Sequence, residues 1–176
     1  MIEGGRVRSL EAAVKDVQTV TSAGEDVQEL IHGVRLRHAT THADTRGDLC
    51  EIYDERWEFT TDPVPYVYVV TLNPGSVRGW VVHLAQDDRL FFSAGTIKVA
   101  LYDAREESPT AGDVNVFHLG TNDRALLSIP AGVFHAVKNV GPAPALFVNL
   151  PSQPYNHADP DKYRLPIDTE EIPYRI

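Results

Sequence analysis

The stretch GSVRGWVVHLAQDDRLFFSAG, Gly75 to Gly95, is typical of two short β-strands joined by a polar turn. Side chains two positions apart lie on the same face of a strand, so residues 81 and 83 share a face. Residue 88 lies beyond the turn and comes from the next strand. A second stretch, IPAGVFHAVKN (129–139), brings His135 from a separate strand. Together they predict a small β-barrel, just wide enough for one small ligand, with His83 and His135 facing its interior.

Strand-like runs continue along the chain at short intervals, and Pro and Gly separate them. The runs are 49–53, 66–72, 79–83, 89–92, 97–102, 114–119, 125–129, 133–139 and 145–150. Short strands at this spacing favour an all-β closed sandwich or barrel over a fold that alternates strands and helices.

The two ends of the chain differ from this pattern. Apolar residues recur at helical spacing on either side of a polar break at 21–24, so the sequence predicts a short helical N-terminal extension over 1–32. The residues that carry this pattern are Leu10, Val14, Val17, Val27, Leu30, Ile31 and Val34. The barrel is then expected over 33–176, and its Pro-broken tail from Pro151 is expected to form an extended arm packed on it.

Composition narrows the classes of partner. The formal net charge of −9 works against binding nucleic acid, whereas a small anionic substrate held by a few arginines is compatible with it. Cys50 is the only cysteine, which excludes a disulfide within the chain and fits a reducing cytoplasm. No stretch approaches the ~20 apolar residues that span a bilayer, so no membrane association is expected.

The two stretches are similar to the signature motifs of the cupin superfamily, a group of jelly-roll β-barrels. In those motifs a His-x-His pair, a glutamate and a later histidine converge inside the barrel. Here Val81 stands at the first histidine position and Asp88 at the glutamate position.

With flanking motifs included, the chain from about Gly33 onward resembles the dTDP-4-dehydrorhamnose 3,5-epimerase family of cupins. The motifs are Asp44-x-Arg46-Gly47-x-Leu49-x-Glu51, Arg78-Gly79-Trp80, Lys98-Val99-Ala100-Leu101-Tyr102-Asp103-x-Arg105, Ser108-Pro109-Thr110 and Ile129-Pro130-x-Gly132-x-x-His135.

The resemblance implies metal-free proton transfer on a nucleotide-linked keto sugar, by a homodimer whose N-terminal strands cross between subunits. In the family a histidine removes a proton, an aspartate near the C-terminus orients it, a tyrosine returns a proton, and arginines hold the diphosphate. Val81 maps to the histidine and Asn149 to the tyrosine, and the chain ends at Ile176 about where the aspartate would fall. Neither valine nor asparagine replaces these groups chemically. The sequence therefore predicts a protein that is not the standard 3,5-epimerase.

Three functions stay open at this point: an epimerase- or isomerase-like enzyme acting on a nucleotide-linked keto sugar or related carbonyl compound, a metal-dependent cupin, and a non-catalytic ligand-binding barrel. For the first, His83 and His135 are the candidate catalytic groups and no cofactor is expected. The expected substrate-binding residues are Arg46, Glu51, Arg78, Trp80, Asp103 and Asn149. For the second, two imidazoles and one carboxylate, from His83, Asp88 and His135, suit a divalent metal ion such as Fe(II), Mn or Zn.

Overall fold

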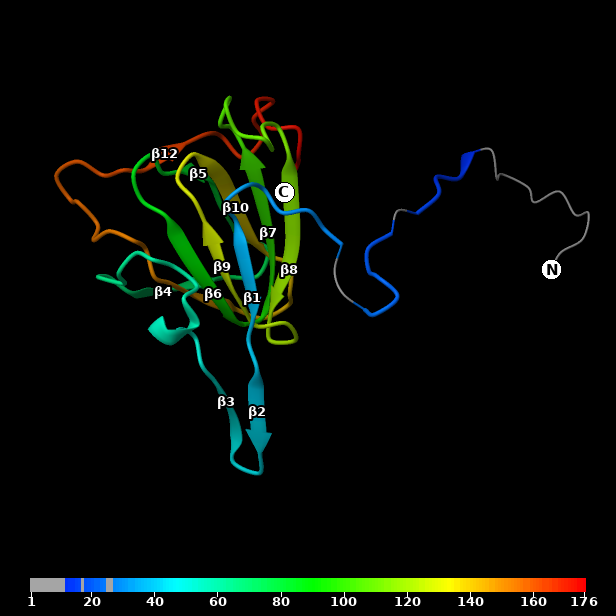
Figure 1. Cartoon of the computed structure of the whole chain (residues 1–176), viewed down its shortest axis with the longest axis vertical. Helices are drawn as coiled ribbons and strands as arrows, with labels where there is room; N and C mark the ends of the chain where they lie inside the picture. The colour runs from blue at the N-terminus through cyan, green and yellow to red at the C-terminus, as the bar shows by residue number, and fades with distance from the viewer. Residues whose placement is uncertain (1–11, 17, 25–26) are drawn as a thin grey trace, which may run out of the picture.

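The computed structural model describes residues 12–16, 18–24 and 27–176. Two five-stranded antiparallel sheets make up the barrel (Figure 1), in the orders β1-β9-β6-β11-β4 and β12-β5-β10-β7-β8. The first sheet contains β1 (Arg35–His38), β9 (Ala125–Ile129), β6 (Asp88–Ala94), β11 (Ala145–Asn149) and β4 (Tyr68–Leu72). The second contains β12 (Tyr163–Arg164), β5 (Val77–Val82), β10 (Val133–Asn139), β7 (Thr96–Asp103) and β8 (Val114–Gly120). The predicted all-β jelly-roll barrel is confirmed.

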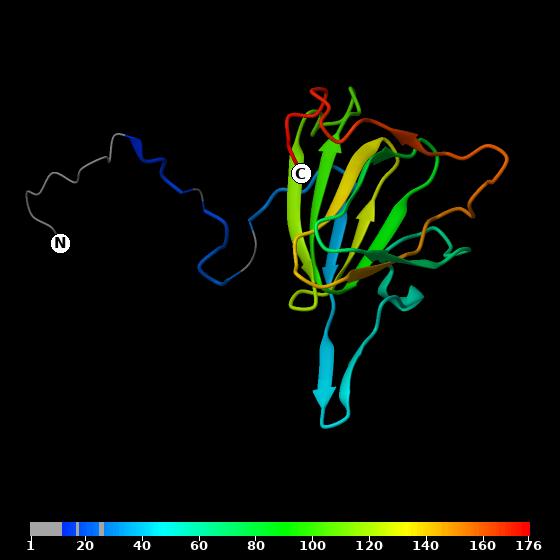
Figure 2. The ribbon, with the colours of Figure 1, turned by 180° about the vertical axis from the view of Figure 1, so that it is seen from behind.

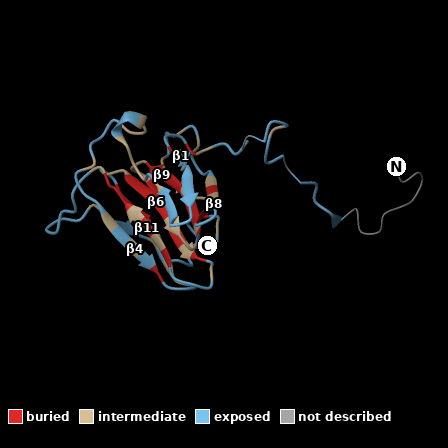
Figure 3. Ribbon diagram, turned by 90° about the horizontal axis from the view of Figure 1, so that it is seen from below, coloured by how far each residue is buried: buried red, intermediate tan, exposed pale blue. Residues whose placement is uncertain are grey.

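The main core lies between the two sheets, where alternate side chains of facing strands meet. Phe92, Leu101 and Leu127 are fully buried there, and Figure 3 shows the buried residues concentrated on the strands. Each such side chain contributes roughly 1.5 to 3 kcal/mol when it leaves water. This packing makes both walls of the barrel rigid supports for the side chains that stand at its open end.

Strand register determines which side chains meet at that end. On the second sheet, His135 of β10 lies opposite Val81 of β5. On the first sheet, Asn149 of β11 lies between Leu90 of β6 and Tyr68 of β4. Polar residues of both walls are thereby brought to one level of the barrel.

A bulge in β5 changes which of its side chains face inward. His135 pairs with Val81 and Val137 pairs with Arg78, so three steps along β5 match two along β10. Gly79 occupies the bulge with φ at 143°, and a Cβ there would lie 2.4 Å from the Cβ of Ala136. The extra residue lets Arg78 face the same side as Val81, while a regular strand would put Arg78 on the opposite face.

Two segments stand outside the barrel. The hairpin of β2 (Thr41–Asp44) and β3 (Gly47–Cys50) projects away from it, as Figures 1 and 2 show. The chain then returns through the short 3-10 helix η2 (Glu55–Trp57), and residues between Cys50 and Val64 cover the outer face of the first sheet over Phe91 and Leu126.

The residues after Pro151 run as an extended arm, and β12 adds a short fifth strand to the edge of β5. Figure 2 shows this arm, coloured orange to red, running along one side of the barrel and then across its top. Farther along, Ile172 is buried against Trp80 on the outer face of the second sheet.

The predicted N-terminal helices are wrong for the residues that the structure describes. None of residues 12–16, 18–24 and 27–33 is α-helical, while Leu10 and Val17 lie outside the described residues. Val14 is 92% exposed, so the helical spacing has no apolar surface to pack against. Ile31 is instead buried in an extended entry to the barrel, where its N–H donates to Asn115 Oδ1 at 2.8 Å. Among the described residues, none belongs to a helix with the length and apolar character of a membrane span.

Candidate active site

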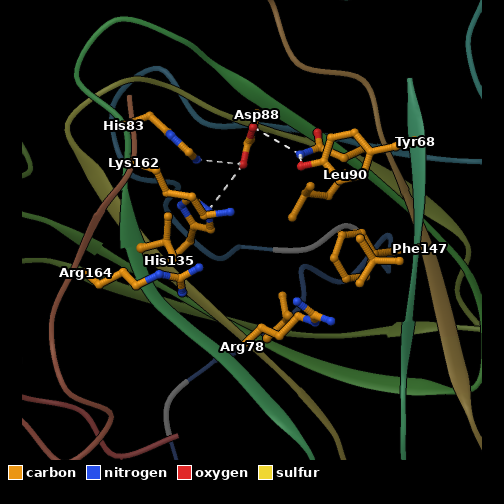
Figure 4. Close-up of a pocket in the computed structure, with 13 residues that line it drawn as sticks. Tyr68, Arg78, His83, Asp88, Leu90, His135, Phe147, Lys162 and Arg164 are labelled. Carbon is orange, nitrogen blue, oxygen red and sulfur yellow. Dashed lines mark hydrogen bonds and ion pairs between the residues drawn. The ribbon is translucent and has the colours of Figure 1, made fainter. Parts of the chain in front are cut away.

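A cavity of about 110 Å³ opens at the end of the barrel that the C-terminal arm crosses (Figure 4). Its floor continues the apolar core through Val70, Leu90, Val137 and Phe147. Its polar lining consists of Tyr68, Arg78, His83, Asp88, His135, Asn149, Lys162 and Arg164. A lining that is apolar toward the core and charged toward the mouth is typical of a small-molecule site.

Three buried side chains form the centre of the cavity. His83 follows the last residue of β5, Asp88 begins β6, and His135 lies on β10. Asp88 Oδ2 lies 3.3 Å from His83 Nε2 and 3.4 Å from His135 Nε2. One carboxylate oxygen therefore contacts both imidazoles, and the structure brings together the three residues that the paired motifs singled out.

The protonation of His83 follows from its two contacts. Its Nδ1 faces the backbone carbonyl oxygen of Asp161 and its Nε2 faces the Asp88 carboxylate, and both partners only accept hydrogen bonds. Burial alone lowers the pKa of His83, but the Asp88 carboxylate raises it, and the pKa is raised overall. His83 is accordingly favoured as an imidazolium that donates from both nitrogens.

His135 is held less tightly. Its Nδ1 lies 3.3 Å from the carbonyl oxygen of Val133, and its Nε2 contact to Asp88 is 3.4 Å long. A neutral ring that keeps its proton on Nδ1 leaves Nε2 free to accept one, next to a carboxylate that stabilises the resulting cation. Burial raises the pKa of Asp88, but the hydrogen bonds that His135 and His83 donate when their Nε2 atoms are protonated outweigh it and hold the pKa well below its usual range.

A second set of hydrogen bonds joins Asp88 to the opposite wall. Asn149 Nδ2 donates to Asp88 Oδ1 at 3.1 Å and to the Tyr68 hydroxyl oxygen at 2.8 Å. Gln86 Nε2 donates to the same Asp88 oxygen at 3.0 Å. Burial and the nearby Asp88 charge raise the pKa of Tyr68, so the phenol keeps its proton.

Three exposed cations surround the mouth of the cavity. Arg78 comes from β5, and Lys162 and Arg164 come from the C-terminal arm. Partial burial and repulsion by Arg164 and Arg78 lower the pKa of Lys162. A wider hollow of about 390 Å³ adjoins this rim, lined by polar groups of Thr71, Asn73 and Ser76 together with Arg78 and Arg164.

Asp161 fixes the arm over the cavity. Its carboxylate accepts hydrogen bonds from the backbone N–H groups of Leu84, Ala85 and Gln86 at 2.8, 2.8 and 3.0 Å. The adjacent carbonyl orients His83, so one residue both closes the turn after β5 and sets the imidazole. Sequence reasoning missed Asp161, Lys162, Arg164 and Tyr68, because no local pattern shows that a Pro-broken tail and an edge strand meet at this cavity.

Four predicted substrate-binding residues lie elsewhere in this chain. Trp80 is fully buried on the outer face of the second sheet, because it points opposite to Val81. Asp103 is buried in a turn, where it accepts from Arg105 Nε at 2.7 Å and from the Ser108 and Thr110 hydroxyls at 2.6 Å each. In this chain Trp80 packs on the second sheet and Asp103 holds a turn, and neither side chain lines the cavity.

The remaining two belong to the projecting hairpin and the segment after it. Arg46 is exposed at the hairpin tip, where its Nε donates to Asp44 Oδ2 at 3.0 Å, and Glu51 is exposed just after β3. Within one chain neither reaches the cavity. Of the predicted substrate-binding set, the structure places Arg78 and Asn149 in the cavity lining.

Comparison with known proteins identifies the family of this chain. The family model of dTDP-4-dehydrorhamnose 3,5-epimerase matches residues 28–169. The chain belongs to this family. Its curated relatives include the probable low-salt glycan biosynthesis epimerase Agl13 of Haloferax volcanii, 39% identical over 78% of this chain and 89% of that protein. Another is the spore coat polysaccharide biosynthesis protein SpsL of Bacillus subtilis, 33% identical over 81% of this chain and 94% of that protein.

Solved structures of this family share the fold. A dTDP sugar isomerase from Desulfovibrio desulfuricans superposes with a TM-score of 0.76 at 26% identity, covering 82% of this chain and 90% of that one. The protein is thus a cupin of the epimerase and isomerase type, whose cavity carries the His83, Asp88 and His135 cluster.

Proposed function

We propose that the protein is an isomerase that moves a proton at a carbon next to the ketone of a nucleotide-linked keto sugar. The observation that carries this proposal is the pairing of a buried acid–base cluster with a rim of exposed cations around one cavity. The Desulfovibrio relative is a dTDP sugar isomerase, which supports the same class of substrate.

In this reaction His135 Nε2 takes the proton from carbon, and the electron pair of the broken C–H bond moves onto the ketone oxygen. His83, already carrying two protons, and the cations nearby stabilise the enolate that forms. Asp88 stabilises the His135 imidazolium and holds both rings. Reprotonation of the carbon on the other face restores the ketone and gives the isomer.

The rim supplies the binding energy for the rest of the substrate. Arg78, Lys162 and Arg164 surround the mouth of a cavity too small for a nucleotide, so the keto sugar enters and the diphosphate stays outside. Guanidinium groups bind phosphate oxygens in a bidentate fashion and keep their charge at all relevant pH values. The adjoining hollow is placed to take the next part of the nucleotide.

The enzyme is inferred to work as a homodimer in the cytoplasm. The projecting hairpin exposes Leu49 by 62%, and β4 is a sheet edge that exposes Val69 by 59%. The family resemblance implies that N-terminal strands cross between subunits. Exchange of this hairpin between subunits would cover these groups and carry Arg46 toward the partner's site. Sedimentation should give a mass near twice 19.5 kDa, and a monomer at micromolar concentration would contradict the dimer.

A lone thiol such as Cys50 stays reduced in the cytoplasm, and cell fractionation tests that compartment.

The direct test is to incubate the protein with dTDP-4-keto-6-deoxyglucose and resolve the sugar products by NMR. The account predicts an isomer changed at a carbon next to the ketone, and no reaction with the same keto sugar lacking its nucleotide. Binding of the nucleotide sugar without any change would instead identify a non-catalytic ligand-binding barrel. Efficient inversion at both neighbouring carbons would show that the substitutions at Val81 and Asn149 do not alter the standard reaction.

A metal-dependent enzyme is the second candidate, because ligand atoms of His83, Asp88 and His135 all lie within 4.8 Å of one another. The residues fit a divalent ion: each Nε2 faces the centre, and each Nδ1 faces a backbone carbonyl, as ligating histidines usually do. The ion would polarise a carbonyl oxygen of the substrate. Metal analysis of protein purified without added metal tests this candidate.

A further inference from the structure

Tyr68 lies on edge strand β4, and neither the sequence nor the family resemblance gives this residue a role. It stands on the wall of the first sheet, and His83 and His135 stand on the wall of the second. Figure 4 shows its ring across the cavity from both histidines. A proton donor on that wall would reach the face of a bound sugar opposite to the base.

The direction of the hydrogen bonds follows from Asp88. Its ionised carboxylate only accepts, so the group of Asn149 at 3.1 Å from it must be the NH₂. The same Nδ2 lies 2.8 Å from the Tyr68 oxygen. The phenol oxygen is therefore an acceptor of this bond, and its own O–H proton is left for another partner.

No acceptor for that proton is present among the residues that the structure describes. The other edge of the amide is also unpaired: Asn149 is 2% exposed, and its Oδ1 has no hydrogen-bond partner among the described residues. Buried polar atoms are normally paired, and unpaired ones in a cavity indicate a missing partner. Tyr68 thus presents a hydroxyl donor from this wall of the cavity, held by the Asn149 amide.

We propose that Tyr68 is the general acid of the reaction, and that Asn149 positions it. Both parts rest on the proposed function. After His135 has taken the proton, the enolate oxygen re-forms the ketone, and the carbon takes the hydroxyl proton of Tyr68 on the opposite face. The tyrosinate then regains a proton from water, His135 loses one, and the site returns to its starting state with the carbon inverted.

The experiment uses Tyr68→Phe, with Tyr66→Phe as the matched control. Tyr66 lies two residues earlier, with its ring centroid 5.4 Å from that of Tyr68, but it does not line the cavity. Two rates are measured on dTDP-4-keto-6-deoxyglucose in D₂O: deuterium exchange at the carbon next to the ketone, and formation of the inverted isomer. A base that removes and returns the proton on one face gives exchange without inversion.

Tyr68→Phe should lower inversion by ~10²- to 10⁴-fold and exchange by less than about 10-fold, while Tyr66→Phe changes neither rate by more than about twofold. Asn149→Leu, which removes the amide but keeps the side-chain shape, should lower inversion relative to exchange in the same direction. Inversion by Tyr68→Phe at the wild-type rate would overturn the role of Tyr68 and leave the proposed function standing. Absence of both exchange and inversion in the wild-type protein would overturn both proposals.

Discussion

Replacing His135 with glutamine should lower deuterium exchange at the carbon next to the ketone by ~10²- to 10⁴-fold, the usual contribution of a general base. Glutamine keeps a polar group of similar length but accepts no proton from carbon. His135 is buried and its contacts are few, so the fold should survive with a small change in melting temperature. The exchange rate is measured by NMR at saturating nucleotide sugar.

The matched control is His118→Gln, because His118 lies exposed on β8 of the same sheet and outside the cavity. The His118→Gln variant should catalyse deuterium exchange at the carbon next to the ketone at the wild-type rate. The same substitution at His83 should also slow the reaction, since the imidazolium there stabilises the enolate. Wild-type exchange by His135→Gln together with complete loss in His83→Gln would reverse the roles of the two histidines.

Replacing Asp88 with asparagine should produce a loss of stability that depends on pH. Because the pKa of His83 is raised in the folded state, the His83–Asp88 pair contributes its full stabilisation of the fold below the unfolded pKa of histidine, ~6.5. This stabilisation is lost as pH rises through the raised pKa. The lowered pKa of Asp88 means that its contribution is present above about pH 4 and is lost as pH falls below that value. Between these limits we expect a loss of about 1.5 to 3 kcal/mol, the range for hydrogen bonds to charged groups.

The measurement is the difference in melting temperature between wild type and Asp88→Asn from pH 5 to 9. It should be largest near pH 5 to 6 and shrink toward pH 9. Asp123→Asn is the control, because Asp123 also pairs with a histidine, His38 at 2.7 Å, but both side chains are about half exposed. Solvent screening should keep that effect below about 1 kcal/mol. A difference for Asp88→Asn that grows with pH would show that His83 does not carry the charge assigned to it.

The barrel could be predicted from the sequence because short strand-like runs recur at close intervals and Pro and Gly lie in many of the gaps. Strands β2 and β12 escaped that reasoning. All residues of β2 are exposed, so its sequence lacks the run of apolar residues that indicates a buried strand. Strand β12 has only two residues and lies in a tail broken by prolines. The helical prediction failed for the opposite reason. Apolar residues recur there at helical spacing, but Val14 is exposed and packs against no other part of the described chain.

The centre of the site was predictable because His83, Asp88 and His135 follow from short-range spacing on paired strands. The same alternation should have placed Trp80 on the outer face, since Trp80 and Val81 are consecutive in a strand. Arg78 lines the cavity because Gly79 inserts a bulge, which alternation alone does not reveal. Lys162 reaches the cavity through contacts between distant parts of the chain. No local sequence pattern predicts such contacts.

The central claim is that this cavity moves a proton with its own side chains. The measurement that tests it most directly is solvent deuterium incorporation into dTDP-4-keto-6-deoxyglucose by wild-type protein stripped of metal with a chelator, beside the same protein reloaded with Zn, Mn or Fe(II). We predict deuterium at a carbon next to the ketone at the same rate in the stripped and reloaded samples. Incorporation that occurs only after reloading, or that fails in every sample despite binding of the nucleotide sugar, would contradict the account.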